Sequence, residues 1–68
     1  HAPDDLIINK VRYYGLSRQT KHIRDIASIL AMSGDEIDWA HLTKWIRQLG
    51  LVPVWLEVKY EVDKLLNP

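Results

Sequence analysis

The chain has 68 residues, a mass of 8.0 kDa and no cysteine, and its nine Lys and Arg balance nine Asp and Glu. This length permits one small domain, the neutral charge excludes the electrostatic footprint of a strong nucleic-acid binder, and the lack of cysteine excludes disulfides and thiolate zinc sites. Because the first residue is His1 and not Met, we expect a single helical domain, residues 1–68, taken from a longer protein. With no long apolar run and no signal segment, we expect a cytoplasmic location and no membrane partner.

Three glycines, at positions 15, 34 and 50, divide the chain into four segments of helical length. Each follows a stretch with apolar residues at helical spacing, where a C-terminal cap is expected. The sequence therefore predicts an all-α bundle of about four helices, with approximate ranges 3–14, 17–33, 38–49 and 52–66.

The first two segments contain polar residues on otherwise apolar faces. In the first, Lys10 falls inside the apolar stripe. It either extends to solvent from the edge of the core or directs a cation at a ligand or an acidic partner. In the second, which Ser17 is expected to cap, one face opposite the main core side carries His22, Asp25, Ile29 and Met32. Either this helix is central in the bundle, or that face is a docking surface for another domain or protein.

The sequence predicts a helix more clearly for the third segment than for the fourth. Asp38 stands at an N-cap position before an apolar arc that Gly50 ends, so the third helix is well specified. In the fourth, alternate apolar residues over 52–62 also fit a strand. The helix is preferred because it accounts for more residues, places Pro53 in the first turn, and needs no partner strand.

Catalytic and metal motifs are absent from the sequence: there is no nucleophile elbow, HExxH, glycine-rich phosphate loop or EF-hand. The acidic residues from Asp35 to Asp38 are typical of the start of a helix, so no metal ligand is predicted. Five of the nine basic residues lie between positions 10 and 24. This segment is either a solvated helix face or a phosphate-facing surface. A helix-turn-helix is disfavoured because its turn would be acidic, so nucleic acid is not expected as a partner of this domain alone.

Three stretches taken in order carry a resemblance to a known family. They are A-P-D-D-L-I-x-x-K, K-H-I-R-D-I-A-S-I-L and S-G-D-E-I-D-W-x-x-L-x-x-W, within residues 2–50. Together they resemble the C-terminal helical part of small bacterial and archaeal nucleotidyltransferase-like proteins, related to the toxins of abortive-infection toxin–antitoxin systems.

The resemblance implies that a catalytic core, with a divalent metal and a nucleoside triphosphate, precedes these helices in the parent protein. None of that core is present in this sequence, so no catalytic residue and no cofactor is expected within the chain alone. By position, the resemblance implies nucleotide-site contributions from Lys10, Lys21, Arg24 and Asp25. The predicted function is an accessory domain that docks on the catalytic core. The alternative is a stand-alone protein-interaction or dimerisation module without catalytic activity.

Overall fold

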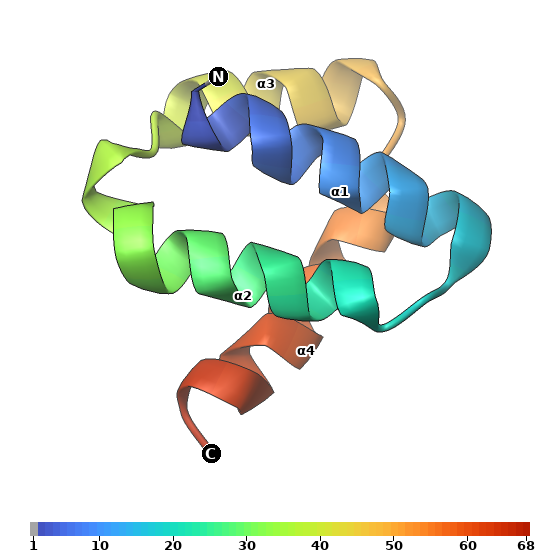
Figure 1. The fold of residues 1–68 in the computed structure, drawn as a ribbon. Coiled ribbons are helices and arrows are strands. Elements are labelled where there is room, and N and C mark those ends of the chain that lie inside the picture. Colours follow the sequence, from blue (N-terminus) through green and yellow to red (C-terminus); the bar gives the residue numbers. More distant parts are fainter. Residues whose placement is uncertain (1) are drawn as a thin grey trace.

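The computed structural model describes residues 2–68, which form four α-helices joined by short connections (Figure 1). The helices, with a single 3-10 turn before α3, are α1 (Pro3–Ser17), α2 (Lys21–Ser33), η1 (Gly34–Glu36), α3 (Trp39–Gln48) and α4 (Val52–Leu66). The all-α prediction is confirmed, and the ambiguous fourth segment is a helix. No helix among the described residues has the length and apolar character needed to cross a membrane.

The bundle is organised around α1 and α2, which pack most extensively against each other (Figure 1). The next largest interface joins α2 to α4, and α1 also packs on α3 and on α4. In Figure 1, α3 lies along the side of α1 opposite α2, and α4 crosses behind α2 towards the C-terminus. The first helix therefore has one side directed at α2 and another at α3.

The core is built mainly from branched aliphatic side chains contributed by all four helices. Its fully buried members are Ile7, Val11, Ile26, Leu42, Ile46, Val58 and Val62. These residues recur at helical spacing within each segment, as the apolar pattern predicts. Their burial supplies the main stabilisation of a domain that has no disulfide.

The boundary between the first two helices is where the sequence interpretation was wrong. The first helix continues through Gly15 to Ser17, and the chain turns at Arg18, which has a left-handed φ of 59°. Ser17 does not cap the second helix: its hydroxyl donates a hydrogen bond to the Tyr13 carbonyl, 2.9 Å away. At Gly15 an added Cβ would lie 3.4 Å from Val54 Cγ2. Gly15 therefore lies inside α1, within van der Waals reach of α4, and does not end the helix.

The predicted limits of α3 are confirmed. The Asp38 side chain accepts a hydrogen bond from the His41 backbone N–H at 3.1 Å, as an N-cap does. After the helix, Gly50 adopts a φ of 70°, its N–H bonds to the Arg47 carbonyl, and the Leu51 N–H bonds to the Ile46 carbonyl. This pair of bonds is a Schellman motif, and glycine is favoured there because its φ is left-handed.

Candidate functional site

The structure brings together two of the residues selected from the sequence, Lys10 and Asp25. Lys10 Nζ donates to Asp25 Oδ2 at 3.0 Å and links α1 to α2, with 32% of the lysine side chain and 48% of the aspartate side chain exposed. The ammonium thus extends from the edge of the core to a carboxylate that solvent can still reach. This hydrogen bond lowers the pKa of the Asp25 carboxyl below its ordinary value, with a smaller opposing effect from desolvation.

The other two selected cations do not join this ion pair. Lys21 and Arg24 are exposed on the first turn of α2, and neither forms an ion pair with another described residue. The charge of Lys21 nevertheless contributes to lowering the pKa of Asp25. Arg24 lines a shallow hollow between α2 and the C-terminal part of α4. The group of four predicted from the sequence therefore contains one contact pair and two separate surface cations.

The predicted docking face on α2 is divided between the interior and the surface. His22 is only 9% exposed, its ring lies 5.9 Å from the Tyr13 ring, and its buried Nδ1 has no hydrogen-bond partner among residues 2–68. Ile29 is partly buried against the core, whereas Met32 is 86% exposed. Of the three, Met32 presents the most apolar surface for a contact outside the chain.

A more extensive apolar surface lies on α4, which the sequence analysis did not select as a site. Val52, Leu56 and Tyr60, spaced four residues apart, are 40%, 60% and 64% exposed. We call these three residues the α4 stripe. The four-residue spacing places them along one side of the helix, while Val58 and Val62 are buried. The sequence signal for the α4 stripe is that α4 contains a second row of apolar residues besides the buried one. Such a surface on a small domain is typical of an interaction site.

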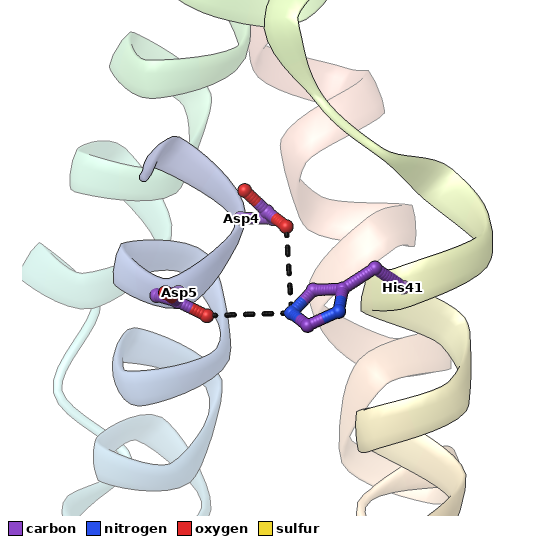
Figure 2. A group of neighbouring side chains, drawn as sticks. All are labelled: Asp4, Asp5 and His41. Carbon is purple, nitrogen blue, oxygen red and sulfur yellow. Dashed lines mark hydrogen bonds and ion pairs between the residues drawn. The ribbon is translucent and has the colours of Figure 1, made fainter. Parts of the chain in front are cut away.

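A second polar cluster joins the start of α1 to the start of α3 (Figure 2). Asp4 Oδ2 lies 3.6 Å from His41 Nε2, and Asp5 Oδ1 lies 3.5 Å from the same nitrogen. One ligand atom from each residue can be chosen so that all three atoms lie within 4.8 Å of one another. No signal in the sequence reveals this cluster, because no motif connects aspartates at a helix start with a histidine 36 positions later. Packing of α1 on α3 creates it.

Comparison with known proteins adds no family to this description, since no family model, curated protein or solved structure matches the chain. The fold and its surfaces define a small all-α domain. Its two polar junctions, Lys10–Asp25 and Asp4–Asp5–His41, connect α1 to different neighbours, and its α4 stripe is open to solvent.

Proposed function

We propose that this chain is an accessory helical domain of a cytoplasmic nucleotidyltransferase-like protein and that it docks on a catalytic core outside these 68 residues. The observation that carries the proposal is the contact between Lys10 and Asp25. These residues are 15 positions apart and were selected for the same nucleotide site, and they meet at 3.0 Å on the exposed side of the α1–α2 interface. The divalent metal and the nucleoside triphosphate belong to the parent protein in this proposal.

The geometry of the ion pair suits a lysine that contacts phosphate. A lysine ammonium has three donors, and the hydrogen bond to Asp25 uses one of them. Asp25 therefore holds the ammonium in place and leaves donors for a phosphate oxygen on the solvent side. In this arrangement Lys10 is the contacting residue and Asp25 is a positioning residue. The nearby cations Lys21 and Arg24 add positive potential on α2, which favours an anionic ligand.

Exposed apolar side chains support the docking part of the proposal. Met32 at the end of α2 is 86% exposed, and Ile29 on the same predicted face is only partly buried. Burying these side chains against a second domain would remove apolar surface from water, which is favourable. We assign Met32 and the exposed part of Ile29 to the interface with the catalytic core. Both residues belong to the docking face on α2 that the sequence predicts.

Binding of nucleotides to the parent protein tests the proposal. The full-length protein encoded by the reading frame is titrated calorimetrically with each of the four Mg–nucleoside triphosphates. Lys10→Gln should weaken the binding of the preferred nucleotide by about 10- to 150-fold, since a hydrogen bond to a charged group contributes about 1.5–3 kcal/mol. Asp25→Asn should weaken it less, because the ammonium remains. Lys44→Gln, at an exposed position on α3, is the matched control and should bind as the unaltered protein does.

Two results would contradict this function. One is that the full-length protein binds none of the four nucleotides. The other is that Lys10→Gln binds the preferred nucleotide as tightly as Lys44→Gln does. The isolated 68-residue chain should bind weakly or not at all, because the metal ligands of the parent are not in it.

The α4 stripe specifically favours the second candidate, a stand-alone interaction or dimerisation module. Sedimentation equilibrium of the isolated chain separates the two candidates. A stable dimer that Leu56→Glu or Met32→Glu dissociates would support the module, and the responding variant would identify the surface. A monomer at all concentrations would leave these side chains exposed and support docking on a larger protein.

A further inference from the structure

We propose that Asp4, Asp5 and His41 form a Zn²⁺ site with three protein ligands and a fourth position open to solvent. The site is independent of the proposed nucleotide function and lies at the junction of α1 and α3. Figure 2 shows both carboxylates approaching His41 Nε2 from the first turn of α1. Four observations carry this inference: the burial of Asp4, the sharing of one nitrogen, the spacing of the ligand atoms and their chemistry.

The first observation is the buried carboxylate of Asp4. The residue is only 7% exposed, and its side chain is 10% exposed. Among residues 2–68 this carboxylate accepts no hydrogen bond, and its single ion pair is the 3.6 Å approach to His41 Nε2. A carboxylate that is largely withdrawn from water is stabilised by a positive charge placed beside it. Asp4 is therefore directed into the cluster, where the cationic partner found for it among residues 2–68 is His41 Nε2 at 3.6 Å.

The second observation is that two carboxylates share one nitrogen. A protonated imidazole presents a single proton at Nε2, and that proton cannot point at the Asp4 and Asp5 oxygens together. The distances of 3.6 and 3.5 Å to the same nitrogen are correspondingly long for hydrogen bonds. A metal ion between the three atoms would interact with all of them, and its two positive charges would neutralise the two carboxylates.

The third observation is the separation of the ligand atoms. Zinc bonds to imidazole nitrogen and to carboxylate oxygen are about 2.0–2.2 Å, which places tetrahedral ligands about 3.3–3.6 Å apart. The nitrogen–oxygen separations of 3.5 and 3.6 Å in the cluster match that spacing. The two carboxylate oxygens are within 4.8 Å of each other, so they would have to approach more closely to reach tetrahedral spacing. The Asp5 side chain is exposed and is the one free to rotate towards that position.

The fourth observation is the ligand set itself. A neutral imidazole with carboxylates suits zinc, whereas Mg²⁺ and Ca²⁺ prefer oxygen ligands alone. Three protein ligands are the number found in zinc sites that keep an exchangeable fourth position. The side chains of Asp5 and His41 are 59% and 38% exposed, so that position faces solvent. It would hold water or a donor group from another molecule.

Titration of the metal-free protein with ZnCl₂ tests the site. Calorimetry should give one zinc ion per chain, and ¹H–¹⁵N NMR shifts should centre on the first turns of α1 and α3. The Trp45 indole should also shift, because its ring lies 6.3 Å from the His41 ring. The measurements are repeated in a His1→Gln background, so that a terminal imidazole adds no zinc binding of its own. Co²⁺ should give the intense visible absorption of tetrahedral coordination.

Three variants and one matched control decide the outcome. His41→Gln, Asp4→Asn and Asp5→Asn should each weaken zinc binding by about tenfold or more, since even indirect ligand-supporting groups contribute about 10- to 100-fold. Asp5 is half exposed, so its variant tests the site even where the buried Asp4 variant unfolds. Asp63→Asn, an exposed acid on α4, should bind zinc normally. The proposal is overturned by absence of saturable 1:1 binding, or by zinc binding that His41→Gln and Asp5→Asn leave unchanged.

Discussion

Two substitutions two positions apart on α4 test how this helix is oriented. Val58 is 0% exposed, whereas Leu56, on the α4 stripe, is 60% exposed. Replacing each by alanine removes apolar atoms from the same helix, but only the first removal leaves a space in the core. We therefore expect Val58→Ala to destabilise the isolated domain and Leu56→Ala to leave its stability almost unchanged.

The expected difference follows from the atoms removed. Val58→Ala deletes two carbon atoms, each contributing about 0.8 kcal/mol when buried. The unfilled space adds to the loss, while the better helix propensity of alanine returns about 0.5 kcal/mol, so the net destabilisation is about 2 kcal/mol. Leu56→Ala should change the free energy of unfolding by less than about 0.5 kcal/mol, as exposed substitutions do. A domain of this size has a total stability of about 3–10 kcal/mol, so both variants should remain folded in water.

Urea unfolding followed by circular dichroism measures both effects. With a denaturant slope of about 1 kcal/mol/M, the midpoint should fall by about 2 M for Val58→Ala and stay nearly constant for Leu56→Ala. Equal losses for the two variants in a monomeric sample would refute the orientation of α4. A loss for Leu56→Ala that appears only as protein concentration rises would show that a second copy buries the stripe.

Two further predictions concern a turn and the ion pair. In a thermal unfolding assay, Gly50→Ala should lower the free energy of unfolding by about 1–2 kcal/mol, because Gly50 has a left-handed φ of 70°. Gly34→Ala should be neutral or stabilising, because Gly34 has a φ of −56° and an added Cβ would have no neighbouring atom within 4 Å. Equal effects of the two changes would contradict this reasoning. The Asp25 carboxyl pKa, followed by ¹³C NMR, should lie below its ordinary 3.8 and rise in Lys10→Met. Because the folded-state pKa is lowered, the stabilisation is present above about pH 4 and is lost as the pH falls through the folded-state pKa. An unchanged Asp25 pKa in Lys10→Met would show that the pair does not persist in solution.

The helices could be predicted where local signals decide the structure. Asp38 caps α3 and Gly50 ends it through bonds formed within a few residues, so the sequence nearby contains the necessary information. Gly15 illustrates the opposite case. It follows an apolar stripe just as Gly50 does, yet it lies inside α1, where Val54 of α4 approaches it. That approach depends on tertiary packing, which the spacing of residues along α1 does not reveal.

The candidate sites also differ in whether the sequence or only the tertiary packing reveals them. The stripe position of Lys10 and the resemblance together selected Lys10 and Asp25, and the structure shows their contact, while their nucleotide role stays a prediction. His41 carries no comparable signal in the sequence. It lies in the first turn of α3, three residues after the N-cap Asp38, and has helical neighbours on both sides. Only the packing of α1 on α3 shows that Asp4 and Asp5 approach its Nε2.

The two proposed sites use different sides of one helix, so a variant that removes zinc binding can be distinguished from one that removes nucleotide binding. Asp4 and Lys10 are six residues apart, about 9 Å along the axis of α1 and about 120° apart around it. Asp4 accordingly meets α3, and Lys10 meets α2. A zinc ion at the α1–α3 junction would therefore restrain α1 without contacting the Lys10 ammonium. Loss of zinc binding in His41→Gln with unchanged Mg–nucleotide binding is the expected result for two independent sites.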